Sequence, residues 1–242
     1  MARVSMAPEA RREELLDVAV RLCATVGYDA FSVDTLTREA SVAKGTFYYY
    51  FGSKQDLLFA LVERFVDALF TELERIAVGP EGSGAERFRL LLLGAASWKI
   101  GHVDDAYGFV PLLYKPENAE LRHHLFDQWG ERCREIFLPC VARGAEDGSL
   151  AVDDPEVTTD LVLSIWIDGA GRMYDRALAA PTEDAYVDII VRNIAALSTA
   201  VERVLGASAG SFTVTLDPAF VRASRVAFLA ALNGSPDHQP RS

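Results

Sequence analysis

The most informative stretch of the sequence is Lys44-Gly45-Thr46-Phe47-Tyr48-Tyr49-Tyr50-Phe51-Gly52-Ser53-Lys54. Phe47 and Phe51 are spaced so that a helix places both side chains on one face, where they anchor it in a small core. The same geometry turns Tyr48 and Tyr49 away from that core. Three consecutive tyrosines on a short helix are hard to explain by packing alone. A phenol can reach a phosphate while its ring lies against a sugar or a thymine methyl, so the pattern predicts a DNA contact.

Two lysines and a glycine in this stretch favour the same interpretation. Lys44 and Lys54 each stand near the N-terminus of a predicted helix, where the macrodipole disfavours positive charge. The position becomes favourable when a phosphate docks on the exposed backbone N–H groups. Gly45 permits close approach to a base pair or to the backbone, at a cost in helix propensity. The alternative is a small helical subdomain with surface lysines and chance aromatic residues.

The segments before this stretch predict two further helices. Ser32 can cap a short helix that ends at Ala40, and residues 41–43 separate it from the tyrosine helix. Two helices joined by such a turn have the layout of a helix-turn-helix, whose second helix enters the DNA major groove. An earlier helix ends at Gly27. Its core-facing stripe consists of Leu15, Val18, Ala19, Leu22 and Cys23.

Helical periodicity continues through the rest of the chain, so the predicted fold class is all-α. After a break at Gly79–Gly84, proline and glycine residues separate the later segments. The helices expected there span residues 54–77, 85–101, 105–114, 117–146, 155–180, 182–206 and 219–232. Residues 233–242 are expected to be disordered.

The charge balance restricts where DNA can bind. The chain of 242 residues carries 24 basic and 35 acidic residues, a net charge of −11, which excludes a uniform coating of nucleic acid. The first 60 residues hold 7 basic and 8 acidic residues, and the remainder holds 17 and 27. A DNA contact must therefore be local and must come from the N-terminal part.

The chain is expected to be a cytoplasmic protein without a membrane anchor. No apolar run approaches the ~18 residues that a spanning helix needs, and the N-terminus lacks the apolar region of a secretory signal. Cys23, Cys133 and Cys140 form no CxxC pair and are expected to be reduced thiols.

Residues from about Glu13 to Phe65 resemble the N-terminal domain of the TetR (tetracycline repressor) family of bacterial transcriptional regulators. The resemblance is carried by the ungapped run Val33-Asp34-Thr35-Leu36-Thr37-Arg38-Glu39-Ala40-Ser41-Val42-Ala43-Lys44-Gly45-Thr46-Phe47-Tyr48-Tyr49-Tyr50-Phe51-Gly52-Ser53-Lys54-Gln55-Asp56-Leu57-Leu58. The remainder resembles the family only in length and helical character. The resemblance implies a helix-turn-helix DNA-binding domain over 1–53, a helical ligand-binding and dimerisation domain over 54–232, and a tail over 233–242.

The resemblance also implies roles for individual residues. Residues 44–46 would reach base edges or nearby phosphates, and Tyr48 would lie close to the bases. Tyr49 and Tyr50 would contact phosphates, and Lys54 would hold a phosphate from the start of the next helix. Ser32 and Thr35 would contact the DNA backbone. The candidate DNA-binding residues are Ser32, Thr35, Lys44, Gly45, Thr46, Tyr48, Tyr49, Tyr50 and Lys54.

One helix-turn-helix makes few contacts, so two copies about one DNA turn apart are expected. The resemblance implies a homodimer formed by the last two long helices, within residues 155–206. The candidate interface residues are Val162, Ile165, Gly169, Met173, Ile190, Ile194, Leu197 and Val201. An ordinary internal core is the alternative, and periodicity does not separate the two.

A small-molecule effector is expected to bind among the helices between residues 85 and 180. Candidate lining residues combine aromatic area with polar tips and are Trp98, His102, Phe109, Tyr114, Trp129, Cys133, Trp166 and Asp168. For each of them individually, plain core is the more common role of such a side chain. Asp168 can recognise a cationic ligand or pair with Arg172 one turn away. By the family's mechanism, the effector displaces the 54–77 helix and changes the spacing of the two recognition helices.

The sequence gives less support to two other classes of function. An enzyme would need a site such as His102 with Asp104 and Asp105, or a metal held by Glu120, His124 and Asp127, but neither matches a known nucleophile or ligand pattern. A helical ligand-binding or scaffolding dimer without DNA binding is favoured slightly by the acidic charge. The sequence therefore predicts a ligand-responsive repressor that binds a palindromic operator as a homodimer, with no cofactor, no metal and no catalytic residue.

Overall fold

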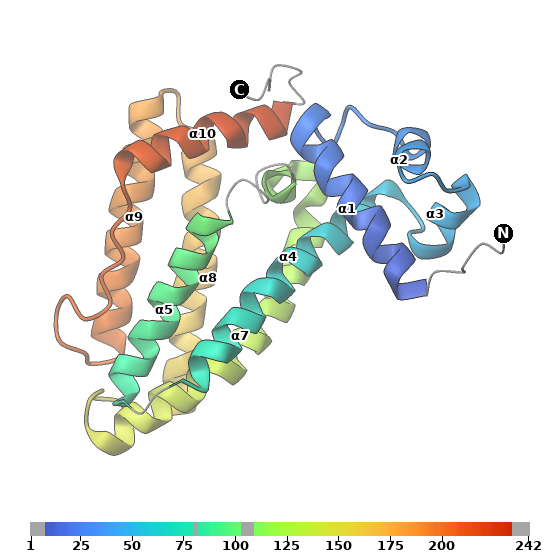
Figure 1. Cartoon of the computed structure of the whole chain (residues 1–242). Coiled ribbons are helices and arrows are strands. Elements are labelled where there is room, and N and C mark those ends of the chain that lie inside the picture. The colour runs from blue at the N-terminus through green and yellow to red at the C-terminus, as the bar shows by residue number, and fades with distance from the viewer. Residues whose placement is uncertain (1–7, 80–81, 103–108, 234–242) are drawn as a thin grey trace. The chain divides into compact units, whose positions relative to one another are not determined.

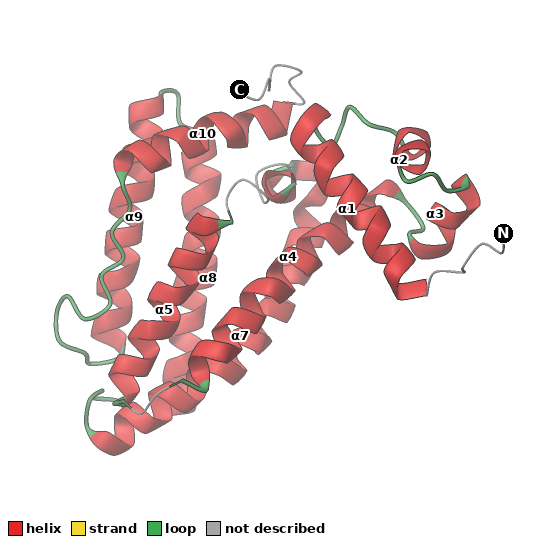
Figure 2. Cartoon of the chain, in the orientation of Figure 1, coloured by secondary structure: helices red, strands yellow, loops and turns green. Residues whose placement is uncertain are grey.

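The computed structural model describes residues 8–79, 82–102 and 109–233, and within these ranges it is helical, without strands (Figures 1 and 2). The all-α prediction is confirmed. The elements are α1 (Pro8–Val26), α2 (Val33–Glu39), α3 (Lys44–Tyr50), α4 (Lys54–Ala77), α5 (Gly84–Gly101), the 3₁₀ helices η1 (Val110–Tyr114) and η2 (Pro116–Asn118), α7 (Ala119–Asp147), α8 (Pro155–Leu178), α9 (Glu183–Val204) and α10 (Pro218–Asn233). No helix in the described ranges is long and apolar enough to cross a membrane.

One expected helix differs from the structure. Of the segment predicted as a helix over 105–114, residues 105–108 lie outside the described residues, and residues 110–114 form the tighter 3₁₀ helix η1. Pro111 near its start cannot donate a backbone hydrogen bond, and Pro116 prevents the turn from extending. Of the tail expected to be disordered over 233–242, Asn233 is the last residue of α10, and residues 234–242 lie outside the described ranges.

The chain forms two compact units. The first comprises residues 1–67, 103–115 and 227–242, and the second comprises residues 68–102 and 116–226. This division differs from a boundary at residue 53, because α4 contributes residues to both units.

The core of the first unit collects the apolar faces of α1, α2, α3 and the start of α4. Phe47 and Phe51 are 0% and 2% exposed, as their helical spacing predicted. They join Leu15, Leu16 and Leu36 in the buried set. The short helix α3 is therefore held by two aromatic anchors on one face, and its other face is left for solvent or a partner.

The turn between α2 and α3 is fixed by local hydrogen bonds. Ser32 caps α2, since its hydroxyl oxygen accepts from the backbone N–H of Thr35 at 3.1 Å. At the other end Ser41 adopts a left-handed backbone conformation with φ of 53°, and Val42 N–H donates to the Thr37 carbonyl at 2.9 Å. This chain reversal ends α2 and sets the direction in which α3 leaves it.

The second unit is a bundle in which α5 packs on α7, α7 on α8, and α8 on α9; Figure 1 shows α8 and α9 running side by side. Gly169 allows the close approach of α8 and α9, because a Cβ atom there would lie 2.4 Å from the Leu197 side chain. A core cluster at one end of the pair contains Met173, Tyr186, Ile190 and Val221, the last from α10.

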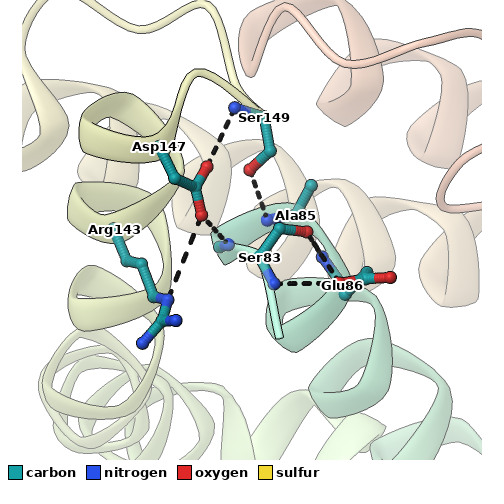
Figure 3. Close-up of polar contacts among 7 residues, drawn as sticks. Ser83, Ala85, Glu86, Arg143, Asp147 and Ser149 are labelled. Atoms are coloured by element: carbon teal, nitrogen blue, oxygen red, sulfur yellow. Dashed lines mark hydrogen bonds and ion pairs between the residues drawn. The ribbon is translucent and has the colours of Figure 1, made fainter. Parts of the chain in front are cut away.

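Figure 3 shows how the start of α5 is attached to the end of α7. The Asp147 carboxylate accepts from Gly84 N–H at 2.8 Å and from Ser149 N–H at 2.9 Å. The Ser149 hydroxyl oxygen accepts from Ala85 N–H at 3.1 Å. These hydrogen bonds, first among them those from Ser149, lower the pKa of Asp147. Ser83 and Glu86 form a capping box at the same end, so the free N–H groups of α5 are satisfied from both sides.

The connection between α9 and α10 is attached by a buried carboxylate. Glu202 is 5% exposed and accepts from Gly210 N–H at 3.0 Å and Phe212 N–H at 2.8 Å. The Phe212 ring lies 4.9 Å from that of Phe88 in the core. A buried charge of this kind is tolerated because backbone donors satisfy it.

Candidate nucleic-acid interface

Helix α3 presents two of its three tyrosines to solvent. The side chains of Tyr48 and Tyr49 are 51% and 76% exposed, while Tyr50 is half-buried. The Tyr48 ring meets Phe47 edge-on at 5.3 Å, and Tyr50 meets Tyr49 edge-on at 4.8 Å. The aromatic anchors thus orient the tyrosines while the phenol groups of Tyr48 and Tyr49 remain accessible.

The start of α3 is open. Gly45 is exposed, and a Cβ atom added there would have no neighbour within 4 Å. The absence of a side chain is therefore not required by packing within this chain, and it leaves space for an incoming molecule. Thr46 is half-buried, and its N–H donates to the Ala43 carbonyl at 2.8 Å.

Lys44 has a partner that sequence reasoning missed. Its ammonium lies 2.8 Å from the carboxylate of Asp34 in the first turn of α2, and both side chains are mostly exposed. The hydrogen bond and the charge of Asp34 raise the pKa of Lys44. The two residues stand at the start of two different helices, and no sequence spacing signals their meeting.

Lys54 is bound inside the unit rather than extended into solvent. Its ammonium donates to the carbonyls of Tyr28 at 2.5 Å and Phe31 at 2.7 Å, and the Tyr28 hydroxyl donates to the Lys54 carbonyl at 2.6 Å. It also lies over the rings of Tyr28 and Phe31, 4.4 and 4.6 Å from their centroids. Burial lowers the pKa of Lys54. Two of its three donors serve the α1–α2 connection, which leaves one for a phosphate.

The two candidates on α2 lie beside Asp34. Ser32 is exposed and Thr35 is half-buried, and their hydroxyl oxygens are 3.1 Å apart. All nine residues predicted to contact DNA belong to the first unit. They stand at the start of α2, along α3 and at the start of α4, which is the layout of a helix-turn-helix.

Comparison with known proteins agrees with this layout. The model for bacterial regulatory proteins of the tetR family matches residues 15–61. A transcriptional regulator of the TetR/AcrR family from Thermobifida fusca is 31% identical to this chain, and the match covers 65% of this chain and 82% of that one, with a TM-score of 0.49. The chain belongs to the TetR family. Membership of this family supports a DNA-binding transcriptional regulator, and the proteins it matches are transcriptional regulators by name.

Two further relatives extend the match beyond the helix-turn-helix. The HTH-type transcriptional repressor KstR2 of Rhodococcus jostii is 28% identical over 147 residues, which are 59% of this chain and 69% of that protein. A TetR-family regulator from Pectobacterium atrosepticum is 22% identical, with a TM-score of 0.59 over 84% of this chain and 98% of that one. At this identity the second likeness concerns the fold alone.

The residues predicted to line a TetR-family effector site fall into both units. Phe109 and Tyr114 belong to the first unit, where Phe109 is buried and its ring lies 6.0 Å from that of Phe65. Tyr114 packs on Phe228 at 5.7 Å. The remaining six belong to the second unit. Trp98 lies on α5 and His102 directly follows it, Trp129 and Cys133 lie on α7, and Trp166 and Asp168 lie on α8.

Within the second unit Lys99 lies within electrostatic range of one of these candidates, Cys133. Trp98 stacks on His102 with ring centroids 4.2 Å apart. Burial raises the pKa of the Cys133 thiol to about 11, and the charge of Lys99 acts in the opposite direction. Sequence reasoning did not select Lys99, although it adjoins Trp98. Asp168 and Arg172 are both exposed, and the pairing expected between them is not formed within the described residues.

Half of the residues predicted at the dimer interface are buried in a single chain. Val162, Met173, Ile190 and Val201 are each less than 5% exposed, so the alternative of an internal core holds for these four. The other four are partly exposed and are Ile165, Gly169, Ile194 and Leu197. Parts of the two stripes meet within the chain: Gly169 on α8 lies against Leu197 on α9, and Met173 and Ile190 belong to one core cluster.

The weaker metal site suggested by Glu120, His124 and Asp127 is not assembled. The His124 ring hydrogen-bonds Gln128 at 3.2 Å. Within the described ranges there is no group of three or more His, Cys, Asp or Glu side chains placed to hold a metal ion. The other weak cluster includes Asp104 and Asp105, which lie outside the described residues.

Proposed function

We propose that this chain is a repressor that binds a palindromic operator as a homodimer and is released by a small-molecule effector. The observation that carries the proposal is the outward face of α3, where Tyr48 and Tyr49 are exposed beside Lys44. A helix of this kind fits the major groove, and its first residues then approach the base edges. The relative KstR2 is a repressor by name.

The homodimer is supported by an apolar pair on α8. Val157 and Leu161 stand one turn apart and are 54% and 53% exposed, which is unusual for such side chains on a helix otherwise packed into a bundle. A two-fold partner that covers them would double the number of DNA contacts. Two recognition helices then read two half-sites about one DNA turn apart, which explains how a unit with so few contacts reaches specific affinity.

The effector is expected to act through the second unit. Its half-buried aromatic side chains on α5, α7 and α8 offer apolar area, as small-molecule sites in proteins usually do. Release from DNA requires that the effector bind more tightly to the conformation that mismatches the operator. The coupling is reciprocal, so operator DNA must weaken effector binding by the same factor.

Selection of bound sequences from random duplex DNA tests the proposal. A palindromic site should emerge, and the affinity of the purified protein for it should fall steeply as the salt concentration rises. Tyr48→Ala should relax the sequence preference, and Tyr48→Phe shows whether the hydroxyl or the ring is responsible. A protein that retards no duplex at low salt would instead be the helical scaffold considered above, and the repressor proposal would be rejected.

We expect Lys54→Ala to weaken both the fold of the first unit and DNA binding. The loss of two charge-assisted hydrogen bonds should lower the free energy of unfolding by about 2 kcal/mol. The loss of one phosphate contact should reduce the salt dependence of binding, log K against log salt, by about 0.9 per subunit. Thermal melting and anisotropy titrations at several salt concentrations measure the two effects.

Lys54→Arg separates these roles. It keeps the charge, but its planar fork cannot place donors on both carbonyls in the same way. It should therefore retain the salt dependence and lose part of the stability. If Lys54→Ala melts like the wild type, the hydrogen bonds to Tyr28 and Phe31 contribute nothing to the fold.

A further inference from the structure

We propose that Asp34 is a specificity-determining residue, whose carboxylate holds the Lys44 ammonium and lowers the affinity for the DNA backbone in general, so that tight binding depends on base contacts. The inference rests on the proposed DNA-binding function. It adds a residue whose charge is opposite to that expected of a DNA contact. The DNA-binding candidates selected from the sequence do not include it.

The geometry places Asp34 within the binding surface and not behind it. Its carboxylate is 2.8 Å from Lys44 Nζ, and the side chains of Asp34 and Lys44 are 69% and 53% exposed. Asp34 lies between Ser32 and Thr35, two residues expected to touch the DNA backbone. Whatever Lys44 reaches on the DNA, this carboxylate must come within a few ångströms of it.

The position has opposite effects on phosphates and on base edges. A phosphate offers an acceptor to Lys44 and leaves Asp34 facing a negative charge, so non-specific contact is disfavoured. A base pair can satisfy both groups, since guanine offers acceptors to a lysine and the cytosine amino group donates to a carboxylate. Lys44 therefore leaves Asp34 for DNA without a loss of free energy only where the DNA sequence offers an acceptor to Lys44 and a donor to Asp34.

The rest of the surface near Asp34 contains a suitable control. Glu39, at the other end of α2, is exposed, and within the described residues it forms no ion pair. Glu39→Gln removes the same charge from the same helix as Asp34→Asn, but it does not affect Lys44. A comparison of the two variants separates the contact from the general change in charge.

The test measures affinity of the full chain for the selected operator and for a scrambled duplex of equal length, at several salt concentrations. Asp34→Asn should bind the scrambled duplex about fivefold more tightly and with a salt dependence steeper by about 0.9 per subunit. Operator affinity should change less, so the ratio of the two affinities falls. Asp34→Glu, which can still reach Lys44, should keep the wild-type ratio.

Four outcomes decide the matter. A fall in the ratio for Asp34→Asn that disappears in a Lys44→Gln background supports the inference. Equal changes in Asp34→Asn and Glu39→Gln show a general charge effect and overturn it, as does an equal loss of affinity for both duplexes. A wild-type protein that binds neither duplex rejects the proposed function itself, which distinguishes that failure from a failure of the role of Asp34.

Discussion

Leu161→Glu is expected to convert the proposed homodimer to a monomer and to lower operator affinity by about a hundredfold or more. Leu161 exposes about half of its surface on α8, one turn after the equally exposed Val157. A glutamate at the centre of a two-fold interface faces its own copy, so that two negative charges are desolvated together. Loss of the second recognition helix then removes the avidity of two linked half-sites, which is worth a factor of about 10² to 10⁴.

Sedimentation velocity at micromolar concentration measures the oligomeric state, and anisotropy measures operator binding. Val78→Glu serves as the control, because Val78 is 83% exposed just after the end of α4 and the substitution adds the same charge. The control should remain dimeric. A Leu161→Glu protein that sediments as a dimer with full operator affinity would place the interface on another face of the chain.

Gly84→Ala is expected to lower the free energy of unfolding by about 3 kcal/mol or more. A Cβ atom at this position would lie 2.0 Å from Gly144 N, 2.3 Å from Gly144 Cα and 2.4 Å from the Cys140 carbonyl oxygen. All three are backbone atoms of α7, which cannot rotate away as a side chain can. The start of α5 must therefore separate from α7, and the hydrogen bond from Gly84 N–H to Asp147 is lost with it.

Urea unfolding measured by circular dichroism gives the free energy. Gly45→Ala is the matched substitution, since Gly45 is also a helical glycine but has no atom within 4 Å of an added Cβ. It should be neutral or stabilise the protein by up to about 1 kcal/mol through helix propensity. Equal stabilities for the two variants would show that the close approach of α5 and α7 is not tight in solution.

The N-terminal helices could be predicted because their determinants are local. The spacing of Phe47 and Phe51, the cap at Ser32 and the glycine at the end of α1 each act within one or two turns of chain. Such signals are legible in sequence because the interacting groups are neighbours along it. Their agreement with one another explains why four consecutive helix boundaries matched closely.

The non-local contacts were beyond sequence reasoning. The macrodipole argument assigned Lys54 to a phosphate, but the carbonyls of Tyr28 and Phe31 also compensate that ammonium. The pairing of Lys44 with Asp34 depends on the angle between two helices, which a three-residue turn does not reveal.

The dimer candidates show a different limit. Periodicity identifies the apolar face of a helix but not what covers it, so a partner chain and an internal core both stayed open for the stripes of α8 and α9. Four of the eight candidates are buried within the single chain. The residues now favoured, Val157 and Leu161, stand out because the structure leaves them uncovered. Exposure of this kind is a property of the folded chain and not of the pattern.

The reciprocal hydrogen bonds between Tyr28 and Lys54 have a mechanical consequence. The side chain of each residue donates a hydrogen bond to the backbone carbonyl of the other. The first turn of α4 therefore cannot rotate without moving the loop around residues 28–31. The helix-turn-helix must then rotate together with the first turn of α4. A spin label on the exposed loop residue Ala30 should therefore report each change in the tilt of the first turn of α4.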